Sequence, residues 1–199
     1  PIDAGESRLK FHIKRASGKN LTLKDDGTAD YKNQDKITAV EKDQYIADII
    51  SSDTQAKDGY DVTGKELKAK EPPPLNIEIG ENVRQEKQDN GDLKLFAEAS
   101  GELYYDQKRL QVNTVHTVDG NVDMSSGNIK FPGEVQVKGN VHEGFYIMAG
   151  ADVKIAGSVE ACLVSSGQTA TIMQGVVGGN KAAIRAKKDI ETTFAEQAT

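Results

Sequence analysis

The fold is decided by residues 129–155, which read IKFPGEVQVKGNVHEGFYIMAGADVKI. Within this stretch Ile129 and Ile147 are each followed six residues later by a valine, and the pattern continues beyond it. The apolar pairs with this spacing are Ile129 and Val135, Ile147 and Val153, Val164 and Ala170, and Ile184 and Ile190. The spacing inside a pair stays at six, while successive pairs lie 18, 17 and 20 residues apart. This pattern predicts two strands that meet at a constant corner, with length differences absorbed in an outer turn.

Two further series keep the same phase. They are Phe131, Ala149, Ser166 and Ala186, and Val137, Ile155 and Ile172. Of the 19 glycines in the chain, 11 lie between residues 120 and 179, where corners need tight backbone geometry. Coils of about 18 residues that stack in parallel, at a strand spacing of ~4.8 Å, form a β-solenoid. Cys162 takes the position that Phe145 occupies one coil earlier, so we expect a small buried apolar side chain rather than a nucleophile.

Residues 1 to about 118 are typical of short strands joined by tight turns. Leu9, Phe11 and Ile13 alternate with polar neighbours, which predicts a strand with one buried face. Asp26-Gly27 and Asn90-Gly91 are hairpin signals, because both dipeptides tolerate the positive φ angles of a type I′ turn.

The segment from Val40 to Ile50 fits either a helix or a turn followed by a strand. Pro72-Pro73-Pro74 predicts a stiff extended connector. We therefore expect an all-β chain with a β-rich domain at 1–72, a hairpin and connector region at 73–118, and a β-helix at 119–199.

Charge and composition exclude several classes of function. The chain has 199 residues and a net charge of −6, and its basic residues are scattered, which argues against a nucleic-acid partner. No apolar run approaches the ~20 residues of a membrane span, so we expect no membrane insertion. The single cysteine permits no internal disulfide and is compatible with a reducing cytosol. Because the sequence begins at Pro1 without methionine, we expect it to be a fragment of a longer protein.

Several motifs occur together in a characteristic order. They are Asp58 to Gly64 (DGYDVTG), the prolines at 72–74, Gly80 to Val83 (GENV), Gly120 to Asp123 (GNVD), Ser126 to Ile129 (SGNI) and Gly139 to Val141 (GNV). With this set the chain resembles the flagellar assembly protein A family over about residues 20–196. The resemblance implies a β-rich N-terminal region followed by a right-handed parallel β-helix, similar to the C-terminal domain of the division inhibitor MinC. It further implies a cytoplasmic bacterial protein that acts in flagellar assembly or its regulation, with no catalytic residues. Lys187-Lys188 stands where the family usually has a glycine pair, so we expect a wider corner there.

One enzymatic alternative is a hexapeptide-type acyltransferase. Val135, Val141, Ile147, Val153 and Val159 recur at intervals of six, as in that class. The phase then breaks, because Ser165 and Thr171 are polar while Val164 and Ile172 are apolar. A strict hexapeptide triangle does not accommodate such a slip, which argues against this alternative.

The other enzymatic alternative is a polysaccharide-acting β-helix, which needs neighbouring carboxylates on its outer surface. Asp123, His142 and Glu160 follow successive coil openings and would stack as an outward column. The same column is the one weak candidate for a metal site. A solvated ladder of turn residues is the favoured interpretation, and His12 and His116 have no partners at ligand spacing.

Taken together, the sequence predicts a protein without enzymatic activity, metal or cofactor, which serves as a structural or protein-binding scaffold. Its expected partners are other proteins and, through the β-helix, a second copy of the chain. The last coil contains Ile190 and Phe194 without a polar cap. Either Phe194 folds over the coil as a lid, or copies associate through the solenoid, and we favour association because one phenylalanine covers little of a coil.

Overall fold

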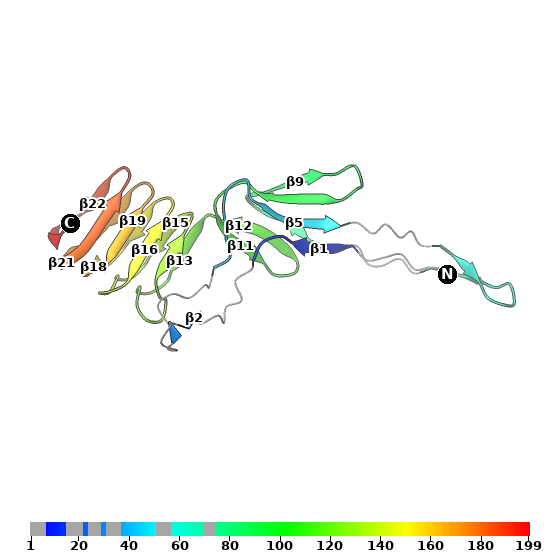
Figure 1. Cartoon of the computed structure of the whole chain (residues 1–199), viewed down its shortest axis with the longest axis horizontal. Coiled ribbons are helices and arrows are strands. Elements are labelled where there is room, and N and C mark those ends of the chain that lie inside the picture. Colours follow the sequence, from blue (N-terminus) through cyan, green and yellow to red (C-terminus); the bar gives the residue numbers. More distant parts are fainter. Residues whose placement is uncertain (1–6, 15–21, 24–28, 31–36, 51–56, 70–74) are drawn as a thin grey trace. The chain divides into compact units, whose positions relative to one another are not determined.

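The computed structural model describes residues 7–14, 22–23, 29–30, 37–50, 57–69 and 75–199. These residues form strands, turns and bends, and the described part of the chain contains no α-helix (Figure 1). The fold is therefore all-β, as the sequence predicted. Contacts divide the chain into two compact units, one of residues 1–14, 42–98 and 104–111 and the other of residues 15–41, 99–103 and 112–199.

The strands before the solenoid are short. They are β1 (Arg8–Phe11), β2 (Thr22–Leu23), β3 (Ala29–Asp30), β4 (Ala39–Val40), β5 (Tyr45–Ile50), β6 (Gly59–Tyr60), β7 (Glu66–Leu67), β8 (Glu78–Ile79), β9 (Val83–Lys87), β10 (Leu93–Ala97), β11 (Gly101–Tyr105) and β12 (Arg109–Asn113). Two four-stranded sheets have the orders β1-β5-β10-β9 and β4-β11-β12-β8, and two-stranded sheets join β2 with β3 and β6 with β7.

The sheet β1-β5-β10-β9 has one buried and one exposed face. Leu9 and Phe11 pair with Ile49 and Ala47 on the buried side, while Arg8 and Lys10 are exposed. The alternation predicted for this strand is confirmed. Ala47, Leu95 and the neighbouring Ile46 have no solvent exposure and form the core of this unit.

The segment from Val40 to Ile50 forms a turn and a strand, so its helical alternative is wrong. Asp43 takes a φ of 63° in the turn, and Tyr45–Ile50 then pairs with both β1 and β10. Pairing on both sides satisfies the backbone of this central strand, which outweighs the local helical pattern.

Asn90-Gly91 joins β9 to β10 in a hairpin, as predicted, but the turn is not of type I′. Only Gly91 has a positive φ, of 87°, and its N–H donates to the carbonyl of Gln88 at 3.0 Å. One residue in the left-handed region suits a type I turn followed by a glycine bulge. The dipeptide Asp26-Gly27 and the prolines at 72–74 lie outside the described residues.

The solenoid strands are β13 (Val115–Val118), β14 (Ile129–Phe131), β15 (Glu134–Val137), β16 (Tyr146–Ala149), β17 (Val153–Ile155), β18 (Ser158–Val159), β19 (Leu163–Ser166), β20 (Ala170–Ile172), β21 (Gly175–Ala186), β22 (Ile190–Thr192) and β23 (Ala195–Ala198). They stack side by side in parallel (Figure 1). One face has the order β13-β15-β17-β20-β22, a second runs through β14-β16-β19-β21, and a third is formed by single bridges and by β18, β21 and β23.

The register of these strands matches the sequence repeat residue by residue. Ile129, Ile147, Val164 and Ile184 are successive partners on one face. Val135, Val153, Ala170 and Ile190 are successive partners on the next. Strand β13 already pairs in parallel with β15, so the solenoid begins at Val115, ahead of the boundary expected at residue 119.

As far as Ile190, all length variation between coils falls at one of the three corners, which we call the variable corner. The step from the second face to the third is four residues in successive coils, as from Val137 to Val141 and from Ile155 to Val159. In the last coil the step from the second face to the third, from Thr192 to Ala195, is one residue shorter than the four residues found before it. The step from the third face to the first is 7 residues from Val122 to Ile129 but 8 from Val176 to Ile184. The outer turn expected to absorb slack is therefore the variable corner. At Lys187-Lys188 the step from Ile184 to Ile190 stays at six, so the lysine pair does not change the spacing of that corner.

The solenoid core consists of the apolar side chains that point inward from the three faces. Its buried members include Val122, Ile129, Phe131, Val135, Val141, Ile147, Val153, Ile155, Val159, Val164 and Ile172. Cys162 is buried in the position that Phe145 fills one coil earlier, as predicted. Ser166 is the buried polar member of the inward series, and its single hydroxyl proton is shared between the carbonyl oxygens of Ala151 and Thr169, which lie 2.8 and 2.9 Å from Oγ.

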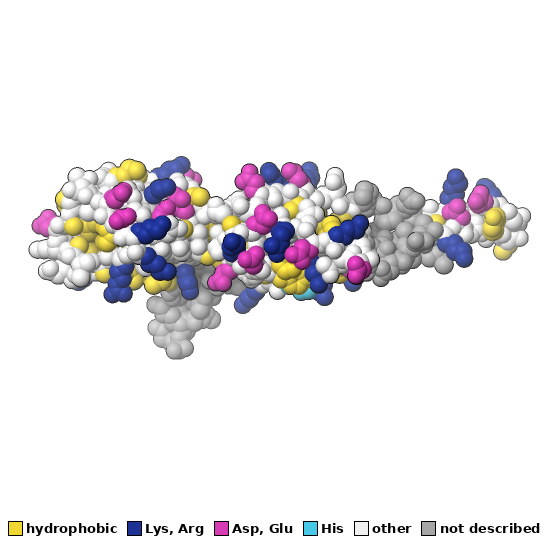
Figure 2. All heavy atoms as spheres, turned by 90° about the horizontal axis from the view of Figure 1, so that it is seen from above, with side chains coloured by type: hydrophobic (Ala, Val, Ile, Leu, Met, Phe, Trp, Pro, Cys, Tyr) yellow, Lys and Arg dark blue, Asp and Glu magenta, His cyan; other side chains and the backbone are white. Residues whose placement is uncertain are grey.

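The surface carries both signs of charge. Figure 2 shows basic and acidic side chains intermingled on the face that it displays, without a broad area of one sign. No apolar helix of membrane-spanning length occurs in the part of the chain that the structure describes.

The register predicts how a charge should act at neighbouring positions of β17. Val153→Asp places a carboxylate among the inward side chains, where no partner can solvate it, and should lower the free energy of unfolding by several kcal/mol. Lys154→Gln, the control, removes only a partly exposed ion pair with Glu134 and should cost less than about 1 kcal/mol. Urea unfolding measures both values. Comparable losses for the two variants would contradict the register.

Candidate functional site

The column Asp123, His142 and Glu160 lies at the variable corner of the solenoid. Each residue follows a member of the bridged series Val122, Val141 and Val159, so the three occupy equivalent places in successive coils. The structure brings two of them together: His142 Nδ1 lies 3.1 Å from Glu160 Oε1. The other carboxylate oxygen of Glu160 accepts the Glu143 N–H at 3.1 Å.

Asp123 is satisfied within its own turn rather than by the column. Its Oδ1 accepts the Ser125 hydroxyl at 2.6 Å and the Ser125 N–H at 2.8 Å. These two hydrogen bonds, with a smaller contribution from the nearby His142, hold the pKa of Asp123 below its usual value. Met124, the residue that follows Asp123, is exposed to solvent.

The next place in the column is taken by Val177, because Val159 is followed by Val176 in the register. A valine, which has no metal-ligating atom, therefore ends the column after three coils. Across the described ranges, no three His, Cys, Asp or Glu side chains converge to hold a metal ion. The geometry of the column is that of a solvated turn ladder whose members bind their own coil or the next one.

Beside this column lies an asparagine ladder that the sequence analysis did not single out. The side-chain oxygen of Asn121 accepts the Asn140 N–H at 2.8 Å, and that of Asn140 accepts the Ser158 N–H at 2.9 Å. A Cβ at Gly139 would overlap the side-chain oxygen of Asn121. In the Gly-Asn-Val repeat the glycine of one coil therefore leaves room for the asparagine side chain of the coil before it. The repeat itself was the available signal, and its role is to fasten one coil to the next.

A polar cluster on the exposed face of β5 was missed by the sequence analysis. His12 Nε2 donates to Asp48 Oδ2 at 2.8 Å, and the Tyr45 hydroxyl donates to the other oxygen of the same carboxylate. His12 also stacks on Tyr45, with ring centroids 4.5 Å apart and an interplanar angle of 18°. His12 thus has a hydrogen-bond partner and a stacking partner, neither of which could be recognised from its spacing in the sequence.

A β-bulge explains why Tyr45 and Asp48 share a face. In a regular strand, residues three apart point to opposite sides of the sheet. The register between β5 and β10 shifts between Leu95 and Phe96, which leaves Ile46 without a partner on β10. This extra residue turns Tyr45 to the side of Asp48, which is a common effect of bulges.

The bulge also aligns a row of flat side chains across the three strands β5, β10 and β9. Tyr45 packs on Phe96 with centroids 5.3 Å apart, and the Arg84 guanidinium lies 5.4 Å from the centre of the Phe96 ring. Arg84 in turn lies 3.2 Å from a carboxylate oxygen of Glu86. The row is satisfied internally, since each charged member already has a partner of opposite sign.

The protonation equilibria of this cluster follow from its contacts. Partial burial acts to raise the pKa of Asp48, but hydrogen bonds from Tyr45 and His12 and the positive charges of His12 and Lys94 outweigh it, so the pKa lies below its usual value. Partial burial and the Asp48 carboxylate raise the pKa of Tyr45 to about 12. The ionised aspartate and the neutral tyrosine are thus both stabilised at neutral pH.

The remaining residues singled out from the sequence have structural environments. Burial, with a smaller contribution from Glu160, raises the pKa of the Cys162 thiol to about 12, so the thiolate is not available at neutral pH. His116 packs against Phe131 with ring centroids 5.5 Å apart, and its Nδ1 lies 3.9 Å from Glu102 Oε2.

Comparison with protein families separates the chain into the same two regions as its strand pattern. Residues 1–108 match the Flagellar Assembly Protein A N-terminal region, and residues 114–199 match the Flagellar Assembly Protein A beta solenoid domain. The chain belongs to the flagellar assembly protein A family. Its solenoid domain starts at residue 114 by this comparison and at Val115 by strand pairing. No curated protein and no solved structure matches the chain significantly.

The Tyr45 hydroxyl provides a test of the polar cluster in this family member. Tyr45→Phe removes a hydrogen bond to an ionised carboxylate and should lower the free energy of unfolding by about 1–2 kcal/mol at neutral pH. The contribution of Asp48 is complete above its ordinary pKa of 3.8 and is lost as the pH falls through the lower folded-state value. The contribution of Tyr45 is complete below pH 10.0 and is lost as the pH rises through about 12.

Urea unfolding of both proteins between acid and alkaline pH measures this difference. The matched control is Tyr60→Phe, since the Tyr60 side chain is exposed. A difference between wild type and Tyr45→Phe that persists unchanged at acid pH would contradict the role given to the Asp48 carboxylate.

Proposed function

We propose that this chain is a non-catalytic, protein-binding scaffold that acts in bacterial flagellar assembly or its regulation. Membership of the flagellar assembly protein A family supports the process. The polar clusters described above support a scaffold, because their side chains bond to their own or neighbouring strands. We place the function in the cytoplasm, where a single buried thiol is stable, with proteins rather than nucleic acid or lipid as partners.

The observation that carries the proposal is the outer side of the sheet β14-β16-β19-β21, which we call the solenoid face. Tyr146, Leu163 and Ala183 are successive neighbours there, and Met148, Ser165 and Arg185 form a parallel row. The Met148 side chain is 39% exposed, and Tyr146 and Leu163 are partly exposed. Tyrosine, methionine and arginine are enriched in protein interfaces, and a stacked parallel sheet presents them on a rigid surface.

This proposal is tested by comparing partners of the wild-type protein and of Met148→Glu. Because position 148 is exposed, the new charge should leave the solenoid folded but prevent a partner from binding the solenoid face. Proteins that bind the wild type should therefore be missing from the pull-down with Met148→Glu. The measurement is a pull-down from the native bacterium with mass spectrometry, combined with counts of flagella in a deletion strain that carries each variant. Lys154→Gln, on a different face of the solenoid, is the matched control. Normal flagella in the deletion strain would contradict the proposed function.

Self-association through the solenoid is part of the same proposal. Ile190 and Phe194 in the last coil are each about half exposed. The Phe194 ring lies against Gly175 of the preceding coil. Two copies that meet through these side chains would cover apolar surface that the described residues leave open.

Light scattering coupled to size exclusion, over a range of protein concentrations, measures this association. The expected result is a mass above the 21.5 kDa of one chain at high concentration. The double variant Ile190→Ser with Phe194→Ser should shift the mass toward the monomer. A monomeric wild type at every concentration would contradict association.

A further inference from the structure

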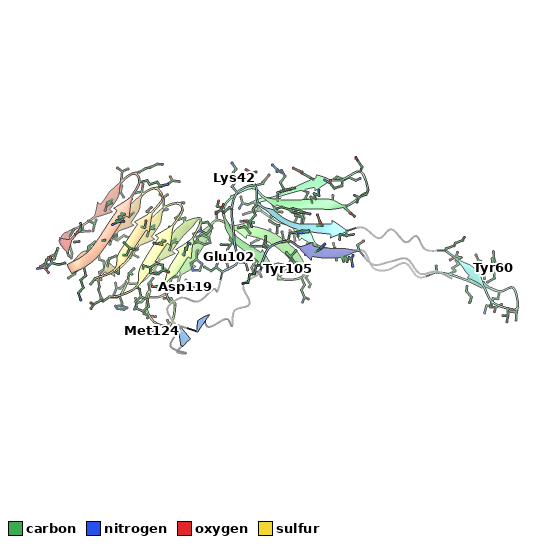
Figure 3. The ribbon with its side chains drawn as sticks, in the orientation of Figure 1. Lys42, Tyr60, Glu102, Tyr105, Asp119 and Met124 are labelled. Carbon is green, nitrogen blue, oxygen red and sulfur yellow. The ribbon has the colours of Figure 1, made fainter. Side chains whose placement is uncertain are left out.

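We propose that the β6–β7 hairpin is a docking finger, residues 57–69, whose Tyr60 and Val62 side chains insert into an apolar pocket of a partner protein. This inference rests on the proposed function, since it names a second binding element of the scaffold. Figure 3 labels Tyr60 on this hairpin. The two strands are only two residues long, Gly59–Tyr60 and Glu66–Leu67.

The tip of the docking finger is fixed by the carboxylate of Asp61. Its Oδ1 accepts the Thr63 hydroxyl at 2.6 Å, the Thr63 N–H at 2.8 Å and the Lys65 N–H at 2.9 Å. These three hydrogen bonds hold the pKa of Asp61 below its usual value, and the one from the Thr63 hydroxyl contributes most. Gly64 completes the turn with a φ of 85°, a backbone conformation that side chains disfavour.

The base of the docking finger is closed by a second aspartate. Asp58 Oδ1 accepts the Ala69 N–H at 2.7 Å, which joins the two ends of the hairpin. A backbone hydrogen bond from the Asp61 N–H to the Lys65 carbonyl, 2.9 Å long, also links the two sides of the hairpin. The hairpin is thus ordered by hydrogen bonds, although isolated two-stranded hairpins are only marginally stable in water.

This ordered backbone presents its apolar side chains to solvent. Val62 is fully exposed, Tyr60 is 73% exposed and Leu67 is 39% exposed. Because the backbone that carries these side chains is already ordered, binding has little further backbone entropy to lose, and more of the burial energy can contribute to affinity. Tyrosine is also among the residues that most often dominate binding energies at interfaces.

The charges of the docking finger decide the kind of partner. Lys57, Lys65 and Lys68 balance Asp58, Asp61 and Glu66, so residues 57–69 carry no net charge. Nucleic acids and anionic membranes select an excess of basic residues, which the finger lacks. Three exposed apolar side chains are also too few to hold a protein on a lipid surface. A protein pocket with an apolar floor and a rim of both signs complements this surface.

The size of the docking finger sets its role within an interface. A stable protein interface buries about 800 Å² on each partner, which exceeds what three side chains supply. The finger therefore acts as an anchor within a larger contact or as the whole of a transient one. Loss of the anchor should reduce affinity about tenfold or more without affecting the folded core.

Site-specific photo-crosslinking in the native bacterium tests this inference. A benzophenone amino acid at position 62 should form a discrete adduct with another protein, and Tyr60→Ala should lower the yield of that adduct about tenfold. The same photoreactive residue at position 115, an exposed site outside the finger, is the control. No adduct at position 62, or an adduct that is insensitive to Tyr60→Ala, would overturn the inference.

Complementation of the deletion strain provides the second measurement. Tyr60→Ala combined with Val62→Ser should fail to restore swimming, while the matched control Tyr104→Ala combined with Val115→Ser, at two other exposed positions, should restore it. Asp61→Asn keeps the apolar side chains but loosens the turn, and it should give intermediate swimming. Full swimming of the strain with the Tyr60 and Val62 double variant would overturn the inference that the docking finger binds a partner. Failure of the wild-type gene to restore swimming would instead contradict the proposed function.

Vesicle sedimentation with the purified protein tests the choice of partner. Vesicles of mixed phosphatidylcholine and phosphatidylserine should leave the wild-type protein in the supernatant. Sedimentation that depends on Val62 would overturn the assignment to a protein partner and favour a lipid surface. The thermal unfolding of the Tyr60 and Val62 variant should equal that of the wild type, because neither side chain is buried.

Discussion

The parallel stacking of inward valine and isoleucine side chains is the constraint on which the solenoid depends. Each of these side chains lies between equivalents one coil before and one coil after, as Val153 lies between Val135 and Ala170. The backbone hydrogen bonds of the faces can form only when this register is kept. The asparagine ladder, the buried Ser166 hydroxyl and the buried Cys162 all occupy places that the register defines.

Hydrogen bonds to side chains take over where this apolar stacking ends. In the docking finger two aspartates hold the backbone that no core supports. On β5 the Asp48 carboxylate accepts hydrogen bonds from Tyr45 of the same strand and from His12, which follows β1. Aspartate side chains therefore have different effects at these two places. Asp58 and Asp61 leave apolar side chains facing solvent, whereas Asp48 occupies the polar groups around it. This contrast is why the finger, and not the His12 cluster, is the better candidate for recognition.

The solenoid register could be predicted from the sequence because an inward side chain must recur once per coil. The faces that contain Ile129, Val135 and Val137 follow directly from that period. The contact between Tyr45 and Asp48 could not be predicted, since it depends on a bulge that breaks the two-residue period of the strand. The column of Asp123, His142 and Glu160 was located correctly, but the sequence did not reveal that Ser125 satisfies Asp123 within its own turn. The solvent exposure of Val62 could not be predicted either, because the DGYDVTG motif gives no information about which other residues pack around it.

The variable corner has a consequence for how such proteins change over evolutionary time. Insertions and deletions that fall there alter only a loop, as between Val176 and Ile184, while one inside the six-residue corner would displace every later coil. Selection should therefore confine length polymorphism among related solenoids to this edge, and whole coils should be gained or lost by duplication. Gly179 and Asn180, both with positive φ, lie where the longest coil accommodates its additional residues. New surface features can accumulate along one edge of the solenoid in this way without any cost to the inward columns.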